Sequence, residues 1–244
     1  MKTNTSKYSF RYCYLMLLII TFAGSLSNNA FAQTASIGST VTWGKVEGIA
    51  VNGLVQGPSA AEADLQVACV FEYTEGDIFN PPALPANLNG MVHLDDALKG
   101  IITELRKSGK FQGHALETLL ITPPKGTLAS KQLLLIGLGD RNKFTPDLMI
   151  SVGSTAMREA LRLGVSNYSF ASDIKDAGID SPTALVAENV VLGSFEAYRT
   201  QSYLKEKKLT DYKPLTKIIL LAGPSFYTVA GEGIKQAIEK LNSK

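Results

Sequence analysis

Cysteine and histidine are nearly absent from this sequence, which has two residues of each among 244. Cys13 lies near the N-terminus and Cys69 far along the chain. If the N-terminal segment is removed, as argued below, Cys69 has no partner and a disulfide within the chain is excluded. The remaining chain must then be stabilised by a hydrophobic core, and about 210 residues are enough for one domain with such a core.

The patterns that usually carry hydrolytic or metal chemistry are also missing. There is no G-x-S-x-G segment, and Gly193-Ser194 falls inside a helical pattern rather than at a strand-to-helix turn. Cys69 lies in an apolar strand pattern without a neighbouring basic group, which predicts an inert, buried thiol. Next to His93, Asp95 and Asp96 are better placed as cap and first-turn residues of a helix that begins after His93 than as metal ligands. We therefore predict no metal, no cofactor and no catalytic residue.

An excess of positive charge is absent once the N-terminal segment is set aside. The chain has 24 basic and 22 acidic residues, and three of the basic ones are Lys2, Lys7 and Arg11. The remaining 21 basic and 22 acidic residues give a net charge of −1, which argues against nucleic-acid binding. The basic run Lys205–Lys208 is typical of a solvated loop.

The only extended apolar run, Tyr14–Ala23, is too short to span a bilayer comfortably. It follows three basic residues and precedes Ala30-Phe31-Ala32, the small-residue pattern that a signal peptidase cleaves. We therefore predict a signal peptide over residues 1–32, cleaved after Ala32, and a periplasmic or secreted protein without a membrane span. An uncleaved anchor is the alternative. Residues 33–44 are predicted to form a flexible leader, and residues 45–244 a single domain.

Strand patterns alternate with helix patterns along the rest of the chain. The branched, apolar segments Leu119–Ile121 and Leu133–Ile136 indicate buried strands. Thr145-Pro146-Asp147 then opens a helix that ends at Gly164. Further strands are predicted in Trp43–Gln56, Asp64–Tyr73, Asn167–Ala171 and Lys217–Leu221, and further helices after Asp95 or Asp96, after Ser181-Pro182 and after Pro224-Ser225. This alternation predicts an α/β fold.

One loop is a candidate ligand site. Gly137, Gly139, Asp140 and Arg141 lie between a strand and a helix, where backbone amides can hold a phosphate group. The segment has Asn142 where a dinucleotide-binding motif has its third glycine. A tight structural turn is therefore the favoured alternative.

The order of several motifs resembles one known family. The segment E-T-L-L at Glu117–Leu120 is followed by P-P-K-G at Pro123–Gly126, G-L-G at Gly137–Gly139 and T-P at Thr145-Pro146, and later by L-G-S-F-E-A-Y at Leu192–Tyr198. This order is similar to the N-terminal domain of the M17 leucyl aminopeptidases. The resemblance implies a three-layer α/β/α sandwich with a mixed sheet of about six strands, similar to a macro domain.

The family's catalytic motifs do not occur in this sequence. Neither N-T-D-x-E-G-R nor G-K-G-x-x-x-D-S-G-G is present, so none of the family's catalytic residues can be assigned here. We expect an exported, stand-alone homologue of the N-terminal domain that acts as a non-catalytic binding or assembly module, with itself or an aminopeptidase catalytic chain as partner. The alternatives are the accessory half of a split metallo-aminopeptidase, and a nucleotide or ADP-ribose binder that uses the macro-like cleft.

Overall fold

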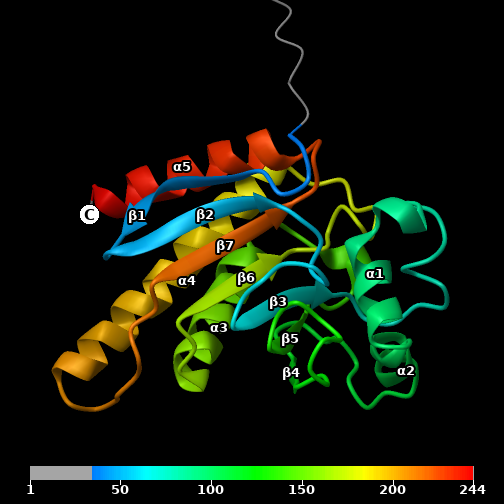
Figure 1. The fold of residues 1–244 in the computed structure, drawn as a ribbon, viewed down its shortest axis with the longest axis horizontal. Helices are drawn as coiled ribbons and strands as arrows, with labels where there is room; N and C mark the ends of the chain where they lie inside the picture. The colour runs from blue at the N-terminus through cyan, green and yellow to red at the C-terminus, as the bar shows by residue number, and fades with distance from the viewer. Residues whose placement is uncertain (1–34, 244) are drawn as a thin grey trace, which may run out of the picture. The chain divides into compact units, whose positions relative to one another are not determined.

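Residues 35–243, which the computed structural model describes, contain seven strands in one sheet (Figure 1). The strands are β1 (Thr40–Val46), β2 (Ile49–Val55), β3 (Leu65–Val70), β4 (Thr118–Ile121), β5 (Gln132–Gly137), β6 (Asn167–Ala171) and β7 (Lys217–Ala222). The helices are α1 (Gly90–Ala97), α2 (Ile101–Lys107), α3 (Leu148–Leu163), α4 (Thr183–Glu206) and α5 (Tyr227–Asn242), with short 3₁₀ turns η1 (Ala86–Leu88) and η2 (Arg141–Lys143).

The sheet is mixed, with the strand order β1-β2-β7-β6-β3-β5-β4. Its five inner strands run parallel, and β1 and β4 are antiparallel edges. Every residue of β3 is buried, because helices or loops cover both of its faces. The predicted α/β class and mixed sheet are confirmed, with one strand more than the resemblance implied.

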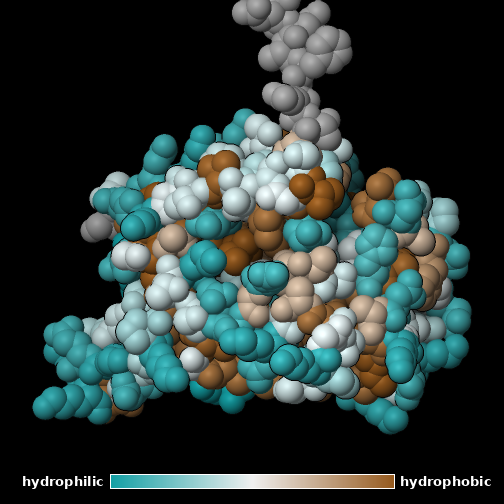
Figure 2. Space-filling view, in the orientation of Figure 1, coloured by the Kyte–Doolittle hydropathy of each residue, from teal (hydrophilic) through white to brown (hydrophobic). Residues whose placement is uncertain are grey.

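Two helical layers of unequal size cover the sheet. Helices α3, α4 and α5 pack on one face and form the larger core with the apolar side chains of β2, β3, β6 and β7. Helices α1 and α2 lie on the other face, where a smaller core joins them to β3 and β5. Among the described residues no helix lies in front of β2 and β7 in Figure 1. Over these strands, Figure 2 shows apolar side chains between polar ones.

Helices α3 and α4 approach each other at two glycines. A Cβ atom on Gly153 would overlap the backbone carbonyl of Val190, and one on Gly193 would overlap that of Ile150. Only a residue without a side chain fits at either position, which lets the two backbones touch. The pair makes the most extensive helix-to-helix contact of the domain.

The serines that follow these glycines bond across the same contact. Ser154 Oγ donates to the carbonyl oxygen of Gly193 over 2.9 Å, and Ser194 Oγ lies 3.2 Å from that of Gly153. The buried hydroxyl of Tyr168 on β6 lies 3.1 Å from Ser194 Oγ. Gly193-Ser194 therefore joins α4 to α3 and to the sheet, consistent with a helical rather than a nucleophilic position.

Several boundaries differ from the predictions. The leader predicted for residues 33–44 is wrong from Thr40 onward, because β1 begins there and pairs with β2. The predicted signal peptide, residues 1–32, lies outside the described residues. In α5, Val229 is an apolar residue that points outward, and 43% of its surface is exposed.

The helix predicted to begin at Asp95 or Asp96 starts five or six residues earlier, at Gly90. Asn89 is its N-cap and accepts a hydrogen bond from the backbone N–H of Val92. Asp95 lies inside α1 and caps α2 instead, where its Oδ1 accepts from the N–H of Ile102 over 2.8 Å. The segment is two short helices, and Asp95 holds the break between them. His93 lies within α1, not before it.

None of the helices in residues 35–243 has the length and hydropathy needed to cross a bilayer.

Replacing Leu135 by alanine tests the placement of β5. Leu135 is fully buried in the smaller core, so Leu135→Ala should lower the free energy of unfolding by about 2–5 kcal/mol through lost burial and a residual cavity. Urea denaturation measures the change. The control is Leu88→Ala at a largely exposed site, with a change within about 0.5 kcal/mol. A loss below about 1 kcal/mol for Leu135→Ala would contradict the placement.

Replacing Gly193 by alanine tests the helix contact. Alanine favours a helix over glycine by about 1 kcal/mol, but overpacking against a rigid backbone costs about 3 kcal/mol. We therefore expect Gly193→Ala to lower the free energy of unfolding by about 2 kcal/mol in a denaturant titration. Gly57→Ala, where a Cβ meets nothing within 4 Å, should cause little change. A stabilised Gly193→Ala variant would show that the helices do not touch.

Candidate functional site

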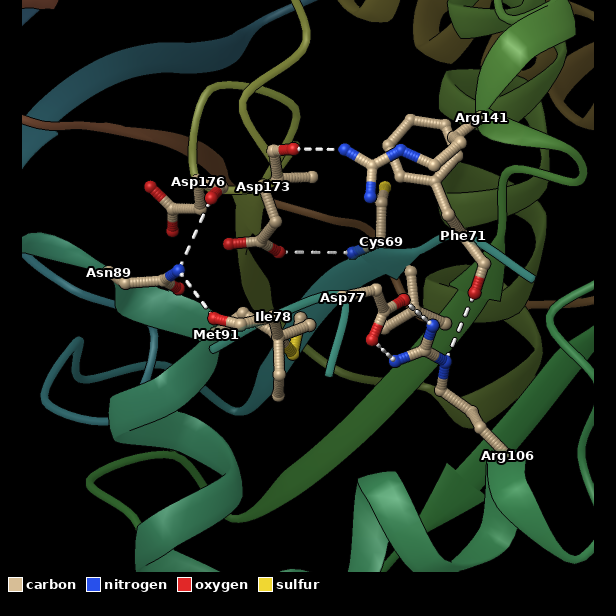
Figure 3. Close-up of a pocket in the computed structure, with 12 residues that line it drawn as sticks. Cys69, Phe71, Asp77, Ile78, Asn89, Met91, Arg106, Arg141, Asp173 and Asp176 are labelled. Atoms are coloured by element: carbon tan, nitrogen blue, oxygen red, sulfur yellow. Dashed lines mark hydrogen bonds and ion pairs between the residues drawn. The ribbon is translucent and has the colours of Figure 1, made fainter. Parts of the chain in front are cut away.

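A small cavity lies where the parallel strands end. The loops that leave β3, β5 and β6 meet there, together with the first turn of α1 and the side chain of Arg106 from α2 (Figure 3). The loop after β3 leads to the helices on one face of the sheet, and the loops after β5 and β6 lead to helices on the other. Such a divergence at the carboxyl ends of strands is where α/β proteins commonly bind ligands.

The cavity is small, with a volume of about 20 Å³. This space holds about one water molecule. A nucleotide or a peptide does not fit it without movement of the surrounding loops.

Two carboxylates from the loop after β6 form the acidic side of the cavity. Asp173 Oδ2 accepts a hydrogen bond from the backbone N–H of Cys69 over 3.2 Å. Asp176 Oδ2 accepts from the N–H of Gly90, at the start of α1, over 2.8 Å. The loop after β6 is thereby tied to β3 and to the first turn of α1.

Burial shifts the titration of these groups. Burial raises the pKa of Asp173 well above its usual value of 3.8, and the neighbouring charge of Asp176 raises it further. Burial also raises the pKa of Asp176, although hydrogen bonds from the N–H groups of Gly90 and Met91 oppose that rise. Asp173 is therefore the member of the pair that holds a proton more readily.

The same surroundings leave Cys69 unreactive. Burial raises the pKa of the Cys69 thiol well above its usual value of 9.0, and the charge of Asp173 contributes. Both effects disfavour the thiolate, which is the nucleophilic form. The prediction of a buried, inert thiol is thus supported.

Arg106 forms the basic side of the cavity, and its charge is already paired. Its guanidinium makes an ion pair with Asp77 and donates through Nε to the carbonyl oxygen of Phe71 over 3.0 Å. Only 1% of the Arg106 side chain is exposed. Removal of either partner would leave a buried charge unpaired, so the pair holds the loop after β3 against α2.

Asn89 joins the loop after β3, the loop after β6 and the first turn of α1. Its Nδ2 donates to the carbonyl oxygens of Ile78 and Asp176 over 3.1 and 3.2 Å, while its Oδ1 caps α1. As with Arg106, the polar atoms of this buried side chain bond to other parts of the chain and connect its loops.

Of the four residues predicted to bind a ligand, one lines the cavity and three do not. Gly137 ends β5, and a Cβ there would overlap the backbone of His114. Gly139 has a φ of +75°, and Asp140 Oδ1 caps η2 by accepting from the N–H of Asn142 over 2.9 Å. Arg141 alone lines the cavity, where it donates to the carbonyl oxygen of Ala177 over 2.5 Å. The structural turn accounts for these contacts, and ligand binding there stays a prediction.

Sequence reasoning missed the residues that line most of the cavity. Asp173 and Asp176 follow directly after the strand Asn167–Ala171, and this placement is a signal that could have identified them. Asn89 and Arg106 carry no comparable signal. His93 is exposed on α1, and within residues 35–243 no three metal-ligating side chains converge.

Sequence comparison decides the family. Residues 74–204 match the profile described as the cytosol aminopeptidase family, N-terminal domain. The chain belongs to this family. The matched range includes the cavity residues Asp77, Asn89, Arg106, Arg141 and Asp173.

Curated relatives of the family are similar over a limited share of their length. A probable cytosol aminopeptidase of Roseiflexus castenholzii is 30% identical over 141 residues, which are 57% of this chain and 28% of the relative. One of Sinorhizobium fredii is 30% identical over 157 residues, which are 59% of this chain and 30% of the relative. The chain thus spans less than a third of the length of these two relatives.

Solved structures share the fold at low sequence identity. A mutant of tomato leucine aminopeptidase superposes with a TM-score of 0.50 at 21% identity and covers 80% of this chain and 36% of its own. A mutant of the Oceanobacillus iheyensis macrodomain superposes with a TM-score of 0.51 at 18% identity and covers 83% and 99%. The expected macro-domain-like fold is confirmed.

The carboxylate pair predicts a specific dependence of stability on pH. Because the pKa of Asp173 is raised on folding, the folded state binds a proton more tightly than the unfolded state. Stability should therefore fall as pH rises from about 4 through the folded pKa. Asp173→Asn removes the charge and suits the left-handed backbone at this residue, so it should be more stable than wild type at pH 7.

Thermal denaturation between pH 4 and pH 8 measures this effect. Asp140→Asn is the control, because the N–H of Asn142 lowers the pKa of Asp140 and makes its contribution decrease as pH falls. An unchanged pH slope in Asp173→Asn would show that Asp173 is ionised at neutral pH without cost.

Proposed function

We propose that this protein is an exported, non-catalytic binding or assembly module of the cytosol aminopeptidase family, and that its partner is an aminopeptidase catalytic chain. The observation that carries the proposal is the extent of the match. The chain matches the family's N-terminal domain and spans less than a third of the two curated relatives described above. Both relatives are named probable cytosol aminopeptidases, and more than two thirds of their length lies outside the match.

The cavity supports a non-catalytic role. Its volume of about 20 Å³ holds about one water molecule, so a substrate would need movement of the surrounding loops. Arg106 is paired with Asp77, and Asp176 is bonded to the first turn of α1. These charged groups stabilise the fold and are not presented to a bound molecule.

The sheet offers a surface for a partner. Asn52 and Leu54 on β2 and Leu221 on β7 are half-buried on the face that carries α1 and α2, in the part over β2 and β7 where no helix of residues 35–243 lies (Figure 1). A flat, partly apolar sheet face can bury the area that a stable protein–protein contact needs. We place the catalytic chain on this face.

Export rests on the N-terminal sequence alone. Three basic residues, the apolar run Tyr14–Ala23 and the small residues Ala30 and Ala32 support a signal peptide cleaved after Ala32. A periplasmic or secreted location follows. The mature protein would begin at Gln33.

Cross-linked capture of the tagged protein from the envelope fraction of its host tests both parts of the proposal. We expect mass spectrometry to find an N-terminal peptide that begins at Gln33 and a partner that carries the N-T-D-A-E-G-R signature. Asn52→Arg on the uncovered sheet face should abolish the capture. Glu196→Arg, exposed on the helical face, is the matched control and should leave it intact.

Three outcomes would contradict the proposal in different ways. Recovery of the protein alone would indicate self-association, and a cytoplasmic, uncleaved chain would exclude export. A purified complex that hydrolyses a leucyl substrate, when the isolated catalytic chain does not, would make this protein the accessory half of a split aminopeptidase.

A further inference from the structure

The C-terminal end of α4 and the loop to β7 project away from the sheet. Figure 1 shows this segment reaching beyond α3 at the lower left. We define the α4 tip as residues 199–216. Of these, five are basic and two are acidic. This local excess contrasts with the near balance of charge in the mature chain.

The turn that ends α4 is well formed and holds a leucine outward. The N–H of Leu209 donates to the carbonyl oxygen of Leu204 over 2.9 Å, and Lys208 has a φ of +60°. In such a helix ending the residue after the left-handed position usually packs back on the helix. Here 72% of Leu209 is exposed, the largest fraction among the exposed large apolar residues of the described chain.

The loop beneath the tip is fixed by polar contacts. Ser202 Oγ lies 2.9 Å from the hydroxyl of Tyr212, and Lys205 Nζ donates to the carbonyl oxygen of Tyr212 over 2.6 Å. Lys205 also forms an ion pair with Asp211 over 2.8 Å. The tip therefore presents Leu209 from a structured base.

Positively charged lysine side chains lie around Leu209. Lys207, Lys208 and Lys213 are exposed, and no acidic side chain of residues 35–243 forms an ion pair with them. Lys207 Nζ lies 5.2 Å from the ring of Tyr203, and 59% of Tyr203 is exposed. In Figure 2 the same end of the molecule shows a brown patch among teal side chains.

We propose that the α4 tip binds the surface of an anionic lipid membrane, with Leu209 and Tyr203 entering the headgroup region and the three lysines contacting lipid phosphates. The charge of the tip is complementary to such a surface. Its shape favours lipid over a protein partner, because a protein interface needs about 800 Å² on each side and a narrow convex tip does not supply it. Nucleic acid would use the lysines but not an exposed leucine.

Flotation with lipid vesicles tests this proposal. The probe is a phosphatidylcholine vesicle with or without about 30% phosphatidylglycerol, since cationic residues respond to anionic headgroups. The protein is residues 33–244, which hold the compact unit and lack the apolar run Tyr14–Ala23. We expect binding to the anionic vesicles only, weakened by high salt.

Two variants of the tip separate its apolar and cationic parts. Leu209→Ser should weaken binding about tenfold through lost apolar burial. Lys207→Gln with Lys208→Gln should weaken it about 25-fold, at about fivefold for each charge. The matched control combines Leu88→Ser with Lys125→Gln, both exposed elsewhere, and should bind like wild type. Circular dichroism verifies that each variant is folded.

Three results would overturn the proposal. They are no binding to anionic vesicles, equal binding by the tip variants and wild type, and binding of a DNA duplex that needs the lysines but is unchanged by Leu209→Ser. The last result would make the tip a general polyanion site instead of a membrane contact. None of these results bears on the aminopeptidase partner proposed above.

Discussion

The contact between α3 and α4 sets the geometry of the larger helical layer. Two glycines, Gly153 and Gly193, let the helix backbones meet, and the serine after each glycine lies close to the opposite carbonyl group. Ser194 also contacts Tyr168 of β6, and this contact fixes the distance between the helix pair and the sheet. The end of α3 determines where β6 begins, and β6 supplies the loop with the two cavity carboxylates. Packing on one face thus positions the polar cluster at the strand ends.

The polar cluster has a structural role that its composition conceals. A buried arginine, two half-buried aspartates and a buried cysteine at the ends of parallel strands have the composition of an active site. Their partners are other parts of the same chain: Arg106 binds Asp77, and Asp173 and Asp176 bind backbone N–H groups. Loops without regular structure need such partners for their backbone groups when they are buried. Where the three loops meet, the side chains of the cluster supply the hydrogen bonds that regular secondary structure supplies elsewhere.

The sequence predicted the strands well because each buried strand is a continuous apolar segment between turn residues. Residues 167–171 and 133–136 lie in strands as predicted, and the motif order identified the family. The start of α1 was missed because Asn89, its cap, follows a proline-rich loop and gave no apolar periodicity. Asp95 was assigned to the wrong helix because one carboxylate can cap either end of a break. The cavity was missed because its residues come from segments about 100 positions apart, as the contact of Asp173 with Cys69 shows.

The pairing of β2 with β7 has a consequence for how the protein acquires its structure. Ala50 pairs with Lys217, so the N-terminal hairpin of β1 and β2 has no inner neighbour until nearly the whole chain exists. Contacts between such distant segments form slowly, since a long loop must close before they stabilise anything. A chain that emerges from the ribosome in order therefore cannot complete its sheet early. Until β7 is present, the inner edge of β2 keeps its backbone groups unpaired and open to pairing with another chain.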